Sequence, residues 1–109
     1  MNIEQLRNYC IAKGEAEESF PFGPDTLVFK TKGKMFLLVG LDSHPLQFNV
    51  KCDPENAIEL REIYPQNILP GYHMNKKYWN TIIVDGILST RQLQQFVDES
   101  YELIRKGKK

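Results

Sequence analysis

The sequence is poor in the features that mark metal-binding and membrane proteins. It has two cysteines, Cys10 and Cys52, which stand in different contexts without the CxxC spacing of zinc and redox motifs. Its two histidines, His44 and His73, lie far apart in the chain. A structural zinc site needs three or four converging ligands, so none is predicted. The longest apolar run, Met35 to Val39, is far too short to span a bilayer. We expect no metal, no cofactor and no membrane segment.

Catalytic patterns are also scarce. The seven glycines are dispersed at turns and form no phosphate-binding loop. Glu15, Glu17 and Glu18 cluster without the apolar surroundings that would raise a carboxyl pKa, which indicates a solvated acidic loop. Cys52 precedes a predicted helix start, where a thiolate can be stabilised, but a small buried thiol is far commoner. We therefore expect a protein that is not an enzyme.

Length and composition are those of one small globular domain. The chain has 109 residues, of which 41% are hydrophobic and 26% charged, and this is ordinary for a folded protein with its own core. Polar and charged side chains occupy residues 1–13, where an apolar run would mark a signal peptide. We expect a single domain over residues 1–109, located in the cytoplasm with reduced thiols.

Charge is balanced in sum but segregated along the chain. The formal net charge is zero, which argues mildly against a general nucleic-acid binder. Residues 1–29 carry two basic and five acidic side chains, residues 30–51 four and one, residues 52–70 one and four, and residues 71–109 seven and four. Ordinary solvated lysines would explain this pattern, and so would basic blocks that meet on one surface. The sequence alone does not decide whether the blocks share a face.

Periodicity predicts a helix and then three strands in the first half of the chain. Ile3, Leu6 and Cys10 form one stripe of a helix over residues 2–13, which Gly14 can end. The acidic stretch GEAEESFPFGPD, with two prolines and two glycines, is typical of a loop. Strands are predicted at residues 26–31 and 34–40, joined by a short hairpin turn at Lys32–Gly33. A third strand at residues 46–51 alternates apolar and polar side chains, as a strand with one wet face does.

The second half starts and ends with well-marked helices. Asp53 is a good N-cap and Pro54 a good first helical residue, for a helix that reaches about Tyr64. A strand, WNTIIVD, follows, and Ser89 with Gln92 forms a capping box for the last helix. The packing stripe of that helix is Leu93, Phe96, Val97, Ser100 and Ile104.

This order predicts an α+β fold. A meander with its helices on one face gives a two-layer sandwich with an antiparallel sheet. Leu46, Phe48 and Val50 should be buried against the helices, and the open face should carry Gln47, Asn49 and Lys51.

The stretch PGYHMNKKYWNT, residues 70–81, allows two interpretations. As a structural corner, it buries its aromatic rings and uses Asn75 for a left-handed turn. Trp79, which opens an apolar strand after that turn, would then be mainly a packing residue. As a binding site, its lysines, aromatics, histidine and asparagine supply phosphate contacts, base stacking and base-edge hydrogen bonds.

Three stretches together resemble a known family. FPFGPDTLVFKTKGKMF, VKCDPENAIELRE and PGYHMNKKYWNTIIVDG are similar, in sequence and order, to the MmcQ/YjbR family of small bacterial proteins. The resemblance runs from Ile3 to about Ile104, and its most specific part is GYHMNKKYWNT. One departure is Lys13–Gly14, where members often have proline before the glycine.

The resemblance implies a secretion-chaperone-like or CyaY-like fold in the order α-β-β-β-α-β-β-α, with an extra short strand around Tyr72 to Asn75. It also implies DNA binding through two β wings, for which this chain offers the hairpin Lys30 to Lys34 and the turn HMNKKYW. The nucleic-acid-binding residues would be Lys34, His73, Asn75, Lys76, Lys77 and Trp79. No catalytic residue is implied.

Two functions follow from these observations. The first is a non-enzymatic protein that binds DNA weakly, through phosphates, from basic turns. The alternative is a protein-interaction or chaperone-like module that uses the open sheet face. A contiguous basic surface would favour the first and an exposed apolar patch the second.

Overall fold

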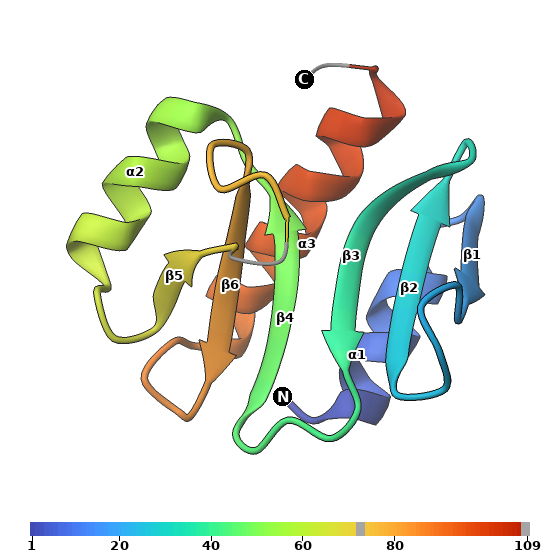
Figure 1. The fold of residues 1–109 in the computed structure, drawn as a ribbon, viewed down its shortest axis with the longest axis horizontal. Helices are drawn as coiled ribbons and strands as arrows, with labels where there is room; N and C mark the ends of the chain where they lie inside the picture. The colour runs from blue at the N-terminus through green and yellow to red at the C-terminus, as the bar shows by residue number, and fades with distance from the viewer. Residues whose placement is uncertain (72–73, 108–109) are drawn as a thin grey trace.

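The computed structural model describes residues 1–71 and 74–107, which form an α+β fold (Figure 1). Its elements, in chain order, are α1 (Ile3–Ile11), β1 (Ala16–Ser19), β2 (Thr26–Thr31), β3 (Lys34–Gly40), β4 (Leu46–Lys51), α2 (Pro54–Ile63), β5 (Ile68–Pro70), β6 (Trp79–Val84) and α3 (Thr90–Arg105). The strands make one antiparallel sheet in the order β1-β2-β3-β4-β6-β5.

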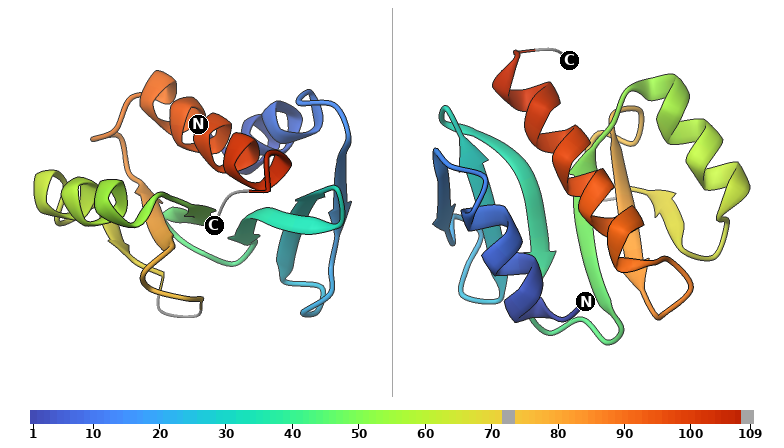
Figure 2. Two further views of the ribbon diagram at one scale, coloured as in Figure 1. Left: turned by 90° about the horizontal axis from the view of Figure 1, so that it is seen from above. Right: turned by 180° about the vertical axis from the view of Figure 1, so that it is seen from behind.

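The helices lie on one side of this sheet. Figure 2 shows α3 and α1 across one face, with α2 beside β5 at the edge. α3 has six buried residues on one stripe, and the predicted stripe is confirmed, with Tyr101 added to it. Together with β2, β3, β4 and β6, this stripe encloses the main core, in which Phe29, Phe36 and Phe48 are fully buried. The two-layer sandwich with an open sheet face is therefore confirmed.

The predicted alternation of side chains along β4 is confirmed, but the side chains on the open face are less exposed than predicted. Phe48 and Val50 are fully buried on the helix side, while Leu46 is only half-buried near the end of the strand. Gln47 and Asn49 face the open side but are also half-buried. Neighbouring residues therefore cover part of the open face of the sheet.

The predicted helix starts are confirmed at atomic detail. The Asp53 side chain accepts a hydrogen bond from the Glu55 backbone N–H at 3.1 Å, with Pro54 as the first helical residue. Ser89 and Gln92 form the reciprocal capping box, with distances of 2.8 and 3.1 Å. These contacts satisfy backbone donors that a helix N-terminus leaves unpaired.

Two strands were not predicted where they occur. The acidic stretch after Gly14 was expected to be a loop, but it contains β1, which pairs with β2 along Ala16–Ser19. Its Glu18 accepts two hydrogen bonds from the Arg7 guanidinium, both at 2.7 Å, and these tie the edge strand to α1. A charged edge strand gives no apolar alternation, because its exposed edge is protected by charge. The observed order is thus α-β-β-β-β-α-β-β-α.

The extra short strand is the second correction. The resemblance placed it around Tyr72 to Asn75, and the structure has it earlier, as β5 at Ile68–Pro70, beside β6. Of the expected range, Tyr72 and His73 lie outside the described residues. Met74 and Asn75 belong to the turn that precedes β6.

Candidate nucleic-acid interface

The first predicted wing is the hairpin between β2 and β3. Lys32 and Gly33 both have positive φ, 53° and 79°, which is the geometry of a two-residue turn that matches the twist of antiparallel strands. Thr31 and Lys34 pair on either side of this turn. Lys32 and Lys34 are exposed. The turn therefore presents lysines at the tip of two rigid strands, as the sequence predicted.

The second wing, the turn that leads into β6, is built on Asn75. The Asn75 backbone carbonyl accepts hydrogen bonds from the backbone N–H groups of Tyr78 and Trp79, both at 3.0 Å. Its side-chain oxygen accepts from the Lys77 backbone N–H at 3.0 Å. The left-handed conformation expected of Asn75 is wrong, because this residue does not have positive φ. Its amide holds the turn by a local hydrogen bond instead, while Lys76 and Lys77 remain exposed.

Trp79 is a packing residue in this structure. Its side chain is 7% exposed, although it lies outside the main core between sheet and helices. A Cβ added to Gly71 would lie 2.9 Å from the Trp79 Cβ, so the two backbones approach closely. The Gly71 N–H donates to the Trp79 carbonyl at 2.9 Å. A ring this covered offers little area for stacking on a base.

Tyr78, in the second wing, contacts residues at the end of β4. The Nζ atoms of Lys51 and Lys77 lie 5.8 and 5.6 Å from the centroid of its ring. The Tyr78 carbonyl also accepts from the Cys52 backbone N–H at 2.7 Å. Two cations near one aromatic ring are stabilised by its quadrupole. Within residues 1–71 and 74–107, neither ammonium has a carboxylate partner within 4.0 Å.

The basic blocks meet at one end of the sheet, which we call the basic end: the hairpin 30–34, Lys51 and the turn 75–78. Because neighbouring strands are antiparallel, the end of β2, the start of β3, the end of β4 and the start of β6 lie at the same end of the sheet (Figure 1). α3 also finishes at this end, with Arg105 and Lys106. The opposite strand ends carry Asp25, Asp42 and Asp85. The basic end also carries acidic residues, since Glu17 pairs with Lys30 and Asp53 with Glu55 begins α2 directly after Lys51, so basic and acidic side chains alternate along it.

Carboxylates offset the basic charge on the helix side of this end. Glu102 lies 2.8 Å from Arg105 and 3.8 Å from Lys106, and Arg105 lowers the pKa of the Glu102 carboxyl through a hydrogen bond. Arg105 and Lys106 are thus partly neutralised. The strand ends, by contrast, present Lys34, Lys51 and Lys77 without ion pairs in the described part of the chain.

Some predicted features lie elsewhere or outside the described residues. His73, the predicted base contact of the second wing, lies outside them, as do Lys108 and Lys109. No group of three or more histidine, cysteine or acidic side chains within the described ranges could hold a metal ion. Among those same residues, no helix has the length and apolar character needed to cross a membrane.

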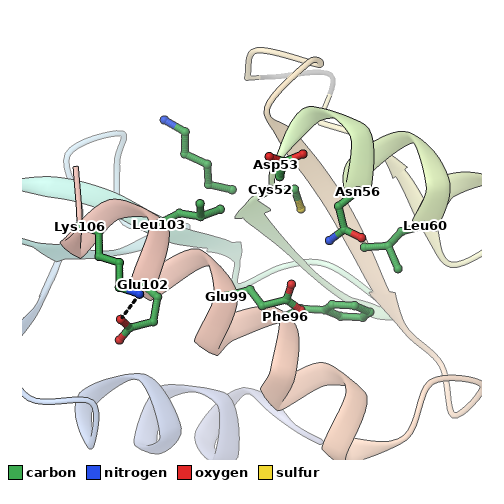
Figure 3. Close-up of a pocket in the computed structure, with 10 residues that line it drawn as sticks. Cys52, Asp53, Asn56, Leu60, Phe96, Glu99, Glu102, Leu103 and Lys106 are labelled. Atoms are coloured by element: carbon green, nitrogen blue, oxygen red, sulfur yellow. Dashed lines mark ion pairs between the residues drawn. The ribbon is translucent and has the colours of Figure 1, made fainter. Parts of the chain in front are cut away.

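A pocket of about 240 Å³ lies between the start of α2 and the last turns of α3 (Figure 3). Cys52, Leu60 and Phe96 line it together with Glu99, whose pKa is raised by burial and by the nearby Asp98. Burial also raises the pKa of the Cys52 thiol to about 12. A thiol so reluctant to ionise is a poor nucleophile, and this agrees with the interpretation of Cys52 as a small buried residue.

A larger groove, of about 570 Å³, lies on the open sheet face, and its volume is in the range of ligand pockets. We call it the open-face groove; it is lined by Phe22, Thr26, Leu38, Gly40, Ser43, Gln47, Asn49, Leu69, Met74 and Thr81. Its floor is the open face of the sheet, where Leu38, Asn49, Thr81 and Leu69 pair across neighbouring strands. Sequence alternation indicated Gln47 and Asn49, but not the loop residues Phe22 and Met74.

Comparison with known proteins places the chain among relatives of similar length and fold. The family model described as YjbR matches residues 11–103. The chain is 39% identical over 92 residues to the uncharacterized protein YbdF of Escherichia coli O157:H7, covering 84% of this chain and 74% of that one. It is 32% identical over 102 residues to the uncharacterized protein YjbR of Escherichia coli K12, covering 94% and 86%.

A solved structure agrees with the fold described above. The crystal structure of Deinococcus radiodurans protein DR2400, with a domain of the DUF419 family model, has a TM-score of 0.91 and 38% sequence identity. The match covers 99% of this chain and 82% of that one. The six-stranded arrangement is therefore shared with a relative across nearly the whole chain.

Proposed function

This chain belongs to the YjbR family, and we propose that it is a non-enzymatic protein that binds DNA weakly, through phosphates, at the basic end of its sheet. The observation that carries the proposal is the gathering of basic strand ends. Lys13 apart, the lysines of the described residues belong to the hairpin 30–34, to the end of β4, to the turn before β6 or to the end of α3. These segments are distant in sequence and lie along the same end of the sheet, with the hairpin on one side of β4 and the turn before β6 on the other.

The chemistry of these lysines suits a phosphate backbone. An ammonium group is a compact, strongly hydrated charge on a flexible stem, so it contacts a phosphate without requiring a fixed geometry. Lys34, the first residue of β3 after the hairpin turn, and Lys77, in the turn before β6, are exposed, so their side chains reach outward without disturbing the core. Such contacts position a protein on nucleic acid but carry no sequence information. We therefore infer binding without strong sequence preference.

No helix of the described fold is suited to read a major groove. α3, the longest, uses its apolar stripe for the core and carries Asp98, Glu99 and Glu102 elsewhere on its surface. Asp98 is engaged by Lys13 and by the Tyr9 hydroxyl. Phosphates would repel the remaining carboxylates, so contact through the turns is the arrangement that the charges favour.

A charge-matched pair of variants tests this proposal. Replacing Lys77 by glutamine, which removes one positive charge from the basic end, should weaken binding to a fluorescently labelled duplex at low ionic strength, measured by anisotropy. Arg91→Gln is the control, because Arg91 is exposed at the start of α3, at the other end of the sheet. Equal losses in both variants would indicate attraction by overall charge alone and would argue against a defined basic end.

An interaction or chaperone-like module is the second candidate function. It is favoured by the exposed aromatic side chains of the loop between β1 and β2, Phe20 at 50% and Phe22 at 63% exposure. Nuclear magnetic resonance with a reduced, unfolded model protein would test it. Amide shifts confined to Gln47, Asn49 and Thr81, with no response to DNA, would favour this function over the first.

A further inference from the structure

We propose that the open-face groove holds the bases of a single-stranded nucleic acid while the basic end holds the adjoining phosphates. This inference rests on the proposed function and adds to it a preference for unpaired bases. The phosphate contacts come from the lysines already described. The groove supplies a different kind of contact, which depends on the base itself.

The groove matches a base in polarity and in charge. Its ten lining residues carry no formal charge, and a nucleobase is likewise uncharged at neutral pH. Hydroxyl and amide groups on the floor lie beside apolar groups on the walls. A base has the same two parts, a flat face that stacks and an edge that forms hydrogen bonds.

The walls come from two loops that are distant in the sequence. Phe22 stands in the loop between β1 and β2, and Met74 in the turn before β6. The left panel of Figure 2 shows both loops projecting beyond the sheet on the side away from α1 and α3. An exposed phenylalanine ring is a stacking platform, and a thioether packs well against aromatic rings. The two loops thus flank the floor with side chains that suit a flat ring.

The floor offers hydrogen bonds that the protein leaves unused. The Thr81 hydroxyl donates to the Asn49 side-chain oxygen at 2.5 Å, which fixes that amide in place. Within the residues that the structure describes, Gln47 makes no side-chain hydrogen bond. Asparagine and glutamine amides donate and accept together, and this is the pattern that base edges require. A fixed amide beside an unpaired one therefore provides a surface for base edges.

β4 runs from the open-face groove, at Gln47 and Asn49, to the basic end, at Lys51. Gln47 and Asn49 alternate onto the open face, about 6.6 Å apart along the strand, and Lys51 follows at the end of the strand, where it also borders the pocket between α2 and α3. The ammonium groups of Lys51 and Lys77 each lie within 6 Å of the centroid of the Tyr78 ring, at 5.8 and 5.6 Å. A strand of nucleic acid lying along β4 would place bases over the two amides and a phosphate beside the two lysines.

A polypeptide suits this surface less well. The face of a sheet has no unpaired backbone groups, since those groups pair between strands, and so an extended peptide cannot add there as a further strand. An amphipathic helix would place its apolar side over Gln47, Asn49 and Thr81, whose polar groups it could not satisfy. The uncharged floor and the basic exit together favour a single strand with its bases inward.

The test compares two oligonucleotides that differ only in their bases. A labelled twelve-nucleotide oligothymidine and an abasic strand of equal length and charge are titrated against the intact protein at low ionic strength. We expect oligothymidine to bind about fivefold more tightly or better, because one stacked base contributes at least that much. Phe22→Ala and Gln47→Ala should each reduce this advantage while leaving affinity for the abasic strand unchanged.

Matched controls separate the groove from general effects. Ile87→Ala removes an apolar side chain that is 69% exposed, close to the 63% of Phe22, and Gln95→Ala removes an exposed amide on α3. Neither residue lines the groove, so neither variant should alter the ratio. Amide spectra of all four variants would verify that they are folded.

Each remaining outcome counts against the inference in a distinguishable way. Equal binding of both strands would overturn the base contacts and leave phosphate binding intact. An advantage for oligothymidine that survives in Phe22→Ala and Gln47→Ala would place the bases outside the groove. Binding of neither strand would refute the proposed function and this inference together. Displacement of oligothymidine by an unfolded polypeptide of neutral charge would favour a peptide as the occupant.

Discussion

Arg61 of α2 fixes the backbone of Lys76. Its Nη1 donates to the Lys76 carbonyl oxygen at 3.0 Å and to the Asn80 side-chain oxygen at 3.3 Å. The Asn80 amide in turn donates to the Ala57 carbonyl at 3.3 Å. The Arg61 guanidinium therefore connects α2, β6 and the turn that carries Lys76 and Lys77. The position of those lysines depends on a residue that need not contact DNA.

Arg61→Ala tests this connection. Removing the guanidinium leaves the buried Asn80 amide with one partner fewer, so we expect the free energy of unfolding to fall by about 1–3 kcal/mol. Affinity for duplex should fall as well, since the turn loses its support. Urea denaturation and anisotropy would measure the two effects. Arg91→Ala, which removes an exposed guanidinium elsewhere, is the control, and an equal loss of affinity in that variant would contradict the positioning role.

Trp79→Ala should be costly for folding. The side chain is 7% exposed and packs where Gly71 approaches β6, so its truncation leaves a cavity. We expect a loss of roughly 3–5 kcal/mol in the free energy of unfolding, as for other large core truncations. Trp79→Phe should lose less, because it keeps an aromatic ring. Stability equal to wild type, with DNA binding lost, would instead mean that the indole contacts a ligand.

The two buried thiols predict a dependence of stability on alkaline pH. Burial raises the pKa of Cys10 and Cys52 from an ordinary value near 9 to about 12. Between these values the unfolded chain loses thiol protons that the folded chain retains, so stability falls as pH rises through this window. Each thiol contributes a slope of at most about 1.4 kcal/mol per pH unit.

Other groups also titrate at high pH, so the contribution of the Cys52 thiol is obtained as the difference in unfolding free energy between wild type and Cys52→Ala. Urea denaturation at several pH values above 9 should show a shallower loss of stability in the variant. At pH 8, iodoacetamide should label neither thiol in the folded protein and both after unfolding. Rapid labelling of Cys52 in the folded state would contradict the burial on which this prediction rests.

Local signals in the sequence were sufficient for the helix starts and for most strands. Asp53 and Ser89 cap helices by hydrogen bonds to backbone groups two or three residues away, and such short-range chemistry is visible in sequence. The alternation of residues 46–51 gave the two faces of β4 for the same reason. Lys32–Gly33 was recognisable because the turn requires positive φ at both positions.

Features that depend on distant partners were not predictable. β1 has a single apolar residue, Ala16, and its strand conformation depends on pairing with β2 and on the contact of Glu18 with Arg7. The open-face groove requires Phe22 and Met74 to meet over one sheet. Asn75 was correctly predicted to lie in a turn, but the left-handed conformation predicted for it was wrong. Whether the lysine blocks share a surface could be decided only from strand order.

The salt dependence of binding tests the central claim most directly. If about three to five lysines each neutralise a phosphate, the logarithm of the affinity for duplex should fall with the logarithm of salt concentration at a slope of about −3 to −4.5. The dissociation constant should lie on the order of 10⁻⁴–10⁻⁶ M, the range of non-specific binding. Replacing Lys76 and Lys77 together by alanine should reduce the slope by about 2 and leave the fold intact. A slope unchanged in that double variant, or no binding to duplex or single strand at low salt, would contradict the account.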